Sequence, residues 1–221
     1  MSAFPQHLLE GYRTFTSQRL PTEQSRYREL AERGQSPEVM VIGCCDSRVS
    51  PEVIFDAGPG ELFVVRNVAN LVPIYQPDSG AHGVSAALEY AVSVLRVKHI
   101  VVLGHAQCGG IRAFIDNNAP LSPGDFIGKW MAMFIKPGEQ VGRRDHETMQ
   151  DFTVRIEKAA VFRSLENLMT FPFVRTPVER GEISLHGAYF GVAEGSLFVL
   201  DQVTKEFRGV ENDGRRVIYR E

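Results

Sequence analysis

Two cysteines and one histidine stand where they could together bind a metal ion. Cys44 follows the apolar run 39–42, and His105 and Cys108 follow the apolar run 100–103. Two thiolates and an imidazole are a known ligand set for catalytic zinc, with water as the fourth ligand, and soft thiolates favour zinc over magnesium or calcium. Each cysteine taken singly could be an ordinary core thiol, because free cysteine is among the most buried residue types. The position of all three groups at the ends of apolar runs favours the metal site.

An aspartate and an arginine follow the first cysteine closely. Asp46 and Arg48 are two residues apart on an expected loop, where they can form an ion pair. The pair could serve only to fix the loop. It could also be functional: Arg48 would hold Asp46 away from zinc, and Asp46 would accept a hydrogen bond from zinc-bound water or hydroxide. The two interpretations are compatible, and both stay open.

The segments that precede these groups predict a parallel sheet. Runs of consecutive apolar residues are typical of parallel strands covered on both faces, and they occur at 39–42, 62–65 and 100–103. In open α/β sheets, sites form in the crevice beyond the carboxyl ends of the strands. The chain therefore sends two thiols and an imidazole to the same edge of one sheet.

Helices are expected between and after these strands. Ser50 and Pro51 have the pattern of an N-cap followed by a proline in the first helical position. A second helix is expected at about 79–95, where many small residues allow close packing. The region around Trp130 and the segment 149–169 are also expected to be helical.

The two ends of the chain add different elements. Residues 184–203 predict two antiparallel strands joined around Glu194-Gly195. Residues 5–33 have a roughly helical apolar spacing, with Pro21 at a break. The fold class is therefore α/β: a single domain with a mainly parallel central sheet flanked by helices, an antiparallel C-terminal strand, and an N-terminal helical arm.

Length and composition set the remaining bounds. A chain of 221 residues is expected to form one domain over 1–221, with 1–34 as an arm that embraces a partner subunit. The net charge is −3 and no block of like charges occurs, so neither nucleic acid nor an anionic membrane is an expected partner. No apolar run is long enough to span a bilayer. The N-terminus has no signal-peptide pattern, and three cysteines are compatible with the reducing cytoplasm, which is the expected compartment.

Two motifs around the expected ligands resemble those of a known family. The hexapeptide C-C-D-S-R-V at 44–49 looks like the C-x-D-S-R-V motif of β-class carbonic anhydrases, and G-H-A-Q-C-G-G at 104–110 resembles their G-H-x-x-C-G-G motif. The segments 63–70 and 88–91 also match the family's pattern. The similarity runs from about residue 35 to residue 200, whereas the N-terminal helices match only in character.

The resemblance implies an activity and a cofactor. It implies that Cys44, His105 and Cys108 bind one Zn²⁺ per chain and that Asp46 and Arg48 form the catalytic dyad. The implied reaction is the reversible hydration of carbon dioxide, in which a zinc-bound hydroxide attacks carbon dioxide to give bicarbonate and a proton. The implied enzyme class is a zinc-dependent lyase, carbonate dehydratase.

The resemblance also implies a substrate cleft and an assembly. Gln35 would donate a hydrogen bond to substrate or product, and the backbone amide of Gly109 would assist. Phe63, Val68 and Tyr90 would form the apolar cleft for carbon dioxide, partly across a subunit interface. The family forms homodimers and multiples of dimers, so a second copy of the chain is the expected partner.

Other interpretations remain open. A relative with the same zinc ligands could hydrolyse carbonyl sulfide or carbon disulfide, because the shape of the cleft decides between these substrates. A non-catalytic zinc-binding protein is disfavoured, since structural zinc sites usually have four protein ligands and the only nearby fourth candidate is Asp46. A thiol redox enzyme or cysteine phosphatase is disfavoured because no C-x-x-C pair occurs and Ser50 stands where a phosphate-binding arginine would be. Cys45, at the variable motif position, is expected to be a packing residue.

One departure from a subgroup of the family bears on regulation. In that subgroup bicarbonate binds a second, non-catalytic pocket made by a tryptophan, an arginine and a tyrosine, and this favours aspartate on zinc. Val41 and Phe190 stand at the tryptophan and tyrosine positions here, and only Arg66 remains. Valine and phenylalanine cannot donate the hydrogen bonds that a buried anion requires. The sequence therefore predicts that Asp46 pairs with Arg48 and that bicarbonate acts only as product.

Overall fold

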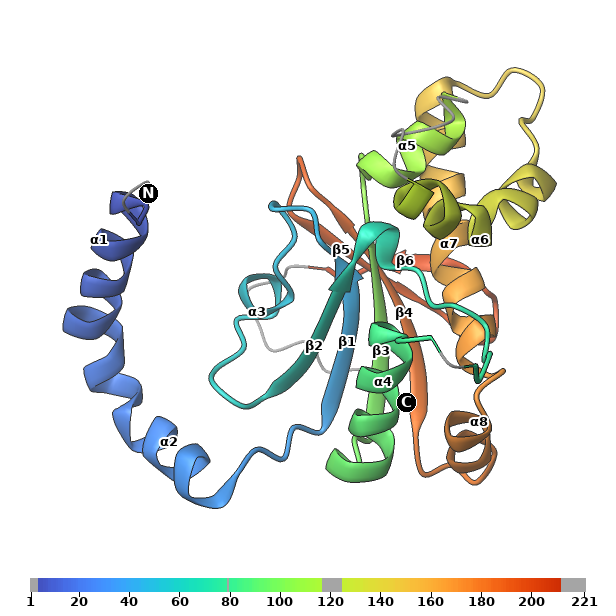
Figure 1. The fold of residues 1–221 in the computed structure, drawn as a ribbon. Coiled ribbons are helices and arrows are strands. Elements are labelled where there is room, and N and C mark those ends of the chain that lie inside the picture. Colours follow the sequence, from blue (N-terminus) through green and yellow to red (C-terminus); the bar gives the residue numbers. More distant parts are fainter. Residues whose placement is uncertain (1–3, 79, 117–124, 212–221) are drawn as a thin grey trace.

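The computed structural model describes residues 4–78, 80–116 and 125–211. Within these ranges the chain forms one six-stranded sheet in the order β2-β1-β3-β4-β5-β6 (Figure 1). The first four strands in this order are parallel, and β5 and β6 are antiparallel to their neighbours. The sheet confirms the predicted fold class and the antiparallel pair at 184–203. The strands are β1 (Val39–Cys44), β2 (Leu62–Asn67), β3 (His99–His105), β4 (Ser184–Gly191), β5 (Ser196–Leu200) and β6 (Phe207–Gly209).

Helices cover both faces of this sheet and its carboxyl edge (Figure 1). The helix expected at about 79–95 begins at Gly83, and its last turn is a π-helix; Ser79 lies outside the described residues. The expected helices around Trp130 and at 149–169 are both present. The helices of the body are α3 (Pro51–Ile54), η2 (Val68–Asn70), α4 (Gly83–Glu89), η3 (Tyr90–Leu95), α5 (Gly109–Ile115), α6 (Asp125–Val141), α7 (Met149–Leu168) and α8 (Pro172–Glu179).

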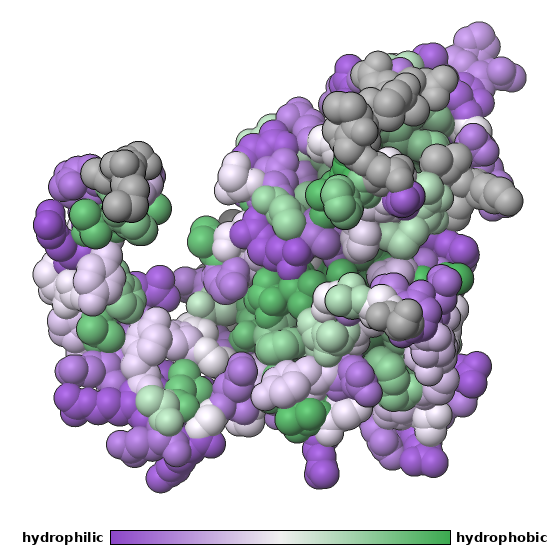
Figure 2. Space-filling view, viewed as in Figure 1, coloured by the Kyte–Doolittle hydropathy of each residue, from purple (hydrophilic) through white to green (hydrophobic). Residues whose placement is uncertain are grey.

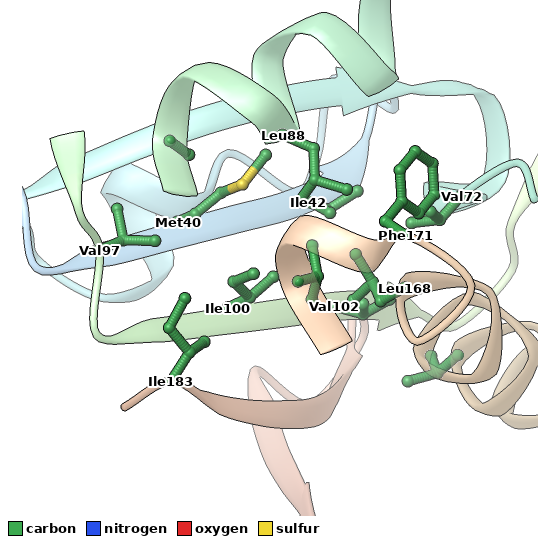
Figure 3. Packing of buried hydrophobic residues seen from close by; sticks show 13 residues of the cluster. Met40, Ile42, Val72, Leu88, Val97, Ile100, Val102, Leu168, Phe171 and Ile183 are labelled. Atoms are coloured by element: carbon green, nitrogen blue, oxygen red, sulfur yellow. The ribbon is translucent and has the colours of Figure 1, made fainter. Parts of the chain in front are cut away.

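Strand β1 shows how the continuous apolar runs are buried. Met40 and Ile42 point to one face, where they pack with Leu88 of α4 and with the end of α7 (Figure 3). Val41 points to the opposite face and packs with Leu103. All three β1 side chains are fully buried, because successive strand residues alternate between two covered faces. A third cluster lies beyond the carboxyl edge, between the strand ends and helices α5 to α7, and it contains two of the predicted ligands.

The N-terminal arm lies apart from the sheet (Figure 1). It consists of α1 (Gln6–Thr14), a π-helical turn η1 (Phe15–Arg19) and α2 (Leu20–Arg33), and none of these described residues is buried. The chain is helical throughout 6–33, so there is no break at Pro21 as predicted; the irregularity is the π-helical turn η1, and Pro21 is the second residue of α2, in the first turn, where proline is tolerated. Arg26 Nε donates to Pro59 O at 3.2 Å and attaches the end of the arm to the body.

Among the described residues, no helix has the length and apolar character needed to cross a membrane.

An ion pair at the start of α7 predicts how stability depends on pH. Arg155 binds both carboxylate oxygens of Glu147, at 2.5 and 2.7 Å, and also donates to the carbonyls of Val141 and Gly142. The Arg155 guanidinium lowers the pKa of Glu147 from its ordinary value of 4.5 to about 2. The pair therefore stabilises the folded state above pH 4.5, and this stabilisation is lost as the pH falls from 4.5 towards 2.

We expect Glu147→Gln to lower the free energy of unfolding at pH 7 and to have little effect near pH 2. Urea unfolding of both proteins at a series of pH values measures this difference. Glu166→Gln is the control, because Glu166 pairs with Arg163 on the same helix but is 68% exposed. A Glu147→Gln effect that stayed constant from pH 7 to pH 2 would contradict the assignment.

Candidate metal centre

The predicted ligands meet at the carboxyl edge of two neighbouring strands. In the β1–β3 register Gly43 lies opposite Leu103, so that Cys44 at the end of β1 is beside the end of β3, where His105 lies. The turn after β3 brings back Cys108, and Gln107 takes a positive φ of 57° in that turn. Ligand atoms of Cys44, His105 and Cys108 all lie within 4.8 Å of one another, and all three residues are buried.

The hydrogen bonding of His105 leaves one ring nitrogen facing inward for a metal. His105 Nδ1 lies 2.9 Å from Ala106 O. A carbonyl can only accept, so Nδ1 carries the proton and Nε2 carries the lone pair. Nε2 is buried and has no hydrogen-bond partner among the described residues. Buried polar atoms are normally paired, and a lone pair beside two thiols fits a metal ion.

The two thiols cannot both ionise easily without a cation. A hydrogen bond from Cys108 lowers the pKa of Cys44 below its ordinary value, against the opposing effect of burial. That same bond, together with burial, raises the pKa of Cys108 well above its ordinary value. Two adjacent thiolates repel each other, and a divalent cation removes this repulsion because it neutralises both. The donor set and its electrostatics therefore fit zinc.

Asp46 and Arg48 form a bidentate pair beside this cluster. Arg48 Nε donates to Asp46 Oδ1 at 2.9 Å and Nη2 donates to Oδ2 at 2.7 Å, while the Arg48 backbone N–H donates to Oδ1 at 3.0 Å. The guanidinium holds the pKa of Asp46 well below its usual range. Arg48 Nη2 also donates to Gln107 O at 3.1 Å, so the arginine links the two loops that carry the ligands. The loop-fixing role and the functional role are thus compatible in one geometry.

Arg66 supports the first ligand loop from the neighbouring strand. Its Nε donates to Cys44 O at 2.8 Å and its Nη2 donates to Asp46 O at 2.7 Å. The sequence analysis considered Arg66 only as the remaining residue of a bicarbonate pocket and did not predict these contacts with the first ligand loop. The available signal was its place at the carboxyl end of β2, one residue before Asn67, which lies opposite Cys44.

A buried glutamate, which the sequence analysis missed, supports the second ligand loop. Glu157 Oε1 accepts from Cys108 N at 3.0 Å, and Oε2 accepts from the Tyr189 hydroxyl at 2.6 Å. Glu157 is 2% exposed, and burial raises its pKa. Its position gave a signal that could have been used, because it falls on the buried face of α7 together with Ile156 and Ala160.

Two of the predicted cleft residues lie near the cluster. Val68 packs against the hydrophobic cluster that contains Cys44 and Cys108. Gly109 directly follows Cys108 and faces open space. Apart from its chain neighbours and its own helix, no described atom lies within 4 Å of the position that a Cβ would take there. A cavity of about 880 Å³ adjoins Gly109, Arg48 and Glu157.

The other three predicted cleft residues lie elsewhere in the single chain. Phe63 precedes Asn67 by four positions on β2, which is about 13 Å along a strand. Its ring packs against Tyr90, with the centroids 5.9 Å apart. Gln35 lies at the other end of the sheet, in a depression of about 470 Å³ near the amino end of β2. One chain therefore does not bring Gln35, Phe63 or Tyr90 to the metal ligands.

Comparison with known proteins assigns the family. Residues 39–197 match the family model described as carbonic anhydrase. The chain is 36% identical over 197 residues to beta carbonic anhydrase 3 of Arabidopsis thaliana, a match that covers 87% of this chain and 75% of the relative. This chain belongs to the β-class carbonic anhydrases. The family's activity is carbonate dehydratase and its cofactor is zinc, and in this chain Cys44, His105 and Cys108 lie close enough together to form a possible metal site.

Further relatives agree with this assignment. Beta carbonic anhydrase 5, chloroplastic, of Arabidopsis thaliana is 37% identical over 174 residues, which is 76% of this chain and 55% of that protein. The solved structure of the beta-carbonic anhydrase CcaA has a TM-score of 0.86 at 29% identity and covers 93% of this chain and 98% of that chain. The Coccomyxa beta-carbonic anhydrase in complex with acetazolamide has a TM-score of 0.76 at 29% identity, covering 90% and 87%.

The ligand assignment predicts the metal content of single variants. We expect Cys108→Ala to lose zinc, because only one thiolate and one imidazole would remain. Cys45→Ala is the matched control: Cys45 is exposed, whereas Cys44 and Cys108 are buried. Elemental analysis of the purified proteins measures zinc per chain. Full zinc content in Cys108→Ala, or loss of zinc in Cys45→Ala, would show that the ligand set is wrong.

Proposed function

We propose that this carbonic anhydrase hydrates carbon dioxide at a centre in which Cys44, His105 and Cys108 bind the zinc. The observation that carries this assignment is the convergence of three buried ligand atoms within 4.8 Å, one of them the unpartnered Nε2 of His105. When bound, zinc supplies a Lewis acid that lowers the pKa of a coordinated water towards neutrality. The protein's own part is to hold the ligands, orient hydrogen-bonding groups and shape the cleft.

Asp46 is the hydrogen-bond acceptor in this proposal. Its low pKa keeps it ionised at neutral pH, so both its oxygens can only accept. Arg48 occupies one side of the carboxylate through two bonds, which leaves the remaining lone pairs to a donor beside the metal ligands. Because Arg48 is itself anchored to Gln107 O, the carboxylate cannot rotate freely towards the cation. Arg48 thus positions Asp46 and keeps it from becoming a fourth ligand.

A second copy of the chain completes the cleft in this proposal. Val68 and the Gly109 amide come from the chain that holds the metal, and Gln35, Phe63 and Tyr90 come from its partner. Three observations support this arrangement. Among the described strands, β2 pairs on one side only, and the arm exposes Leu8 and Tyr12 by 51% and 64%. Figure 2 shows hydrophobic side chains gathered over β2, on the side of the body that faces the arm.

The same proposal treats the chain as one domain in which residues 1–34 are the dimerising arm. One structure similar to this chain, with a TM-score of 0.74 and 26% identity, comes from a description of two tetrameric beta-carbonic anhydrases of Sordaria macrospora. The cytoplasm is the proposed compartment, on the ground that the three cysteines are all unpaired thiols. One relative is named chloroplastic, so fractionation of the source cells is the test of this point.

The proposed role of Arg48 predicts that this residue is needed for activity but not for zinc binding. Stopped-flow measurement of carbon dioxide hydration should show activity that a zinc chelator removes and added zinc restores. We expect Arg48→Ala to keep its zinc and to lose about 10²-fold in kcat, the size of effect expected when a catalytic group is misplaced by about 1 Å. Arg112→Ala is the control, because Arg112 of α5 lines the same cavity but pairs with Asp116, the residue that follows this helix. Full activity in Arg48→Ala would remove the positioning role.

The shared cleft predicts that assembly and activity fall together. We expect the double variant Leu8→Glu/Tyr12→Glu to dissociate, because it places charges on the exposed apolar side chains of α1. Sedimentation velocity measures the assembly, and stopped-flow measures kcat at full zinc content. Gln18→Glu/Gln24→Glu adds the same charge at exposed polar positions of the arm and should change neither. A fully active monomer would contradict the shared cleft.

A further inference from the structure

A carboxylate buried under the second ligand loop calls for explanation. Glu157 is 2% exposed and lies on α7, a helix that packs against β3 and β4. Burying a carboxylate is costly unless its oxygens accept hydrogen bonds. Both oxygens do so: Oε1 from the backbone N–H of Cys108 and Oε2 from the hydroxyl of Tyr189. The first of these donors belongs to Cys108 itself, one of the three proposed zinc ligands.

Tyr189 is held at two points by consecutive residues of α7. Its hydroxyl donates to Glu157 at 2.6 Å. The ammonium of Lys158 lies over the Tyr189 ring, 5.2 Å from its centroid. The same ammonium lies 5.2 Å from the ring of Phe198 and 5.3 Å from that of Phe207, on the neighbouring antiparallel strands. Cation–π contacts of this kind fix the ring relative to the helix, so the hydroxyl has a defined place from which to orient the carboxylate.

A second buried side chain of α7 binds a segment away from the ligand loop. Ser164, about two helical turns after Glu157, accepts from Val72 N at 3.2 Å and donates to Asn70 O at 3.0 Å. These bonds hold the segment that follows β2, and none of them touches a ligand residue. Among the described residues, α7 carries three buried polar side chains that bind other segments, Glu157, Ser164 and Asn167, and of these only Glu157 contacts the ligand loop.

We propose that Glu157 is a positioning residue for zinc: it fixes the Cys108–Gly109 turn, and Tyr189 and Lys158 in turn fix its carboxylate. With the Cys108 N–H bound to Glu157, the thiol is directed at Cys44 and His105 before the metal arrives. The Gly109 amide that follows is placed by the same contact. The proposal rests on the assignment of Cys108 as a zinc ligand.

Zinc affinity and the geometry at the metal are the readouts that test the proposal. The zinc dissociation constant is measured by competition with a chromogenic chelator, and the thiolate-to-metal charge-transfer bands of the cobalt-substituted protein report the geometry. We expect Glu157→Ala to weaken zinc binding by about 10- to 100-fold, the usual effect of removing a group that orients a ligand, and to shift the cobalt bands. Glu157→Gln should remain close to wild type, because its amide can accept from Cys108 N and donate to the Tyr189 oxygen.

Ser164→Ala is the matched control. It removes two buried hydrogen bonds from the same helix, so it should lower the temperature of unfolding and leave zinc affinity and the cobalt spectrum unchanged. The proposal is overturned if Glu157→Ala binds zinc as tightly as wild type with unchanged cobalt bands. It is also overturned if Ser164→Ala weakens zinc binding as much as Glu157→Ala does, since the effect would then be a general loosening of α7.

Two more variants keep the result decisive. If Glu157→Ala does not fold, Tyr189→Phe replaces it: the proposal requires weaker zinc binding and shifted cobalt bands, and two unchanged readouts refute it. Cys108→Ala separates this proposal from the one on which it rests. Zinc retained in Cys108→Ala refutes the ligand set itself, whereas zinc lost in Cys108→Ala but unaffected in Glu157→Ala refutes only the role of Glu157.

Discussion

The electrostatic conflict between two buried thiols is the constraint on which the rest of the site depends. Cys44 and Cys108 lie together in a cluster of apolar side chains, where a second thiolate is strongly disfavoured beside the first. A divalent cation resolves the conflict, and the inward-facing Nε2 of His105 supplies a neutral third donor. Because the ligands come from two separate strand ends, the conflict arises only when β1 and β3 are correctly paired. Pairing of β1 with β3 is therefore what brings the three residues together.

Charged side chains hold each ligand loop in place by binding its backbone. Arg66 binds the carbonyls of the first loop, Glu157 binds an N–H of the second, and Arg48 links the two loops through Gln107 O. Charge-assisted hydrogen bonds are stronger and more directional than neutral ones. The loops can therefore be short and irregular while their ligand atoms stay within a few ångströms of one another.

A single chain supplies only part of the proposed active site. The proposed ligands, the Asp46–Arg48 pair, Val68 and Gly109 gather at the carboxyl edge. Phe63 and Tyr90 pack against each other over the edge strand β2, and the arm has no buried side chain among its described residues. An apolar edge strand and an unpacked helical arm are costly features for an isolated chain. A second copy of the chain that covered both would remove this cost, and this links the proposed cleft to the proposed dimer.

Local sequence determined the elements and the ligand positions, whereas tertiary packing decided what surrounds them. Continuous apolar runs predicted the parallel strands. Cys44, His105 and Cys108 were predicted as ligands because they directly follow these runs, and parallel strands end at a common edge of the sheet. The pairing of Asp46 with Arg48 was also predictable, since it spans only two residues. The contact of Glu157 with Cys108 spans 49 residues and was not predicted. It depends on which face of α7 packs on the sheet and at what height along the strands, and those are set by the fit of many side chains at once.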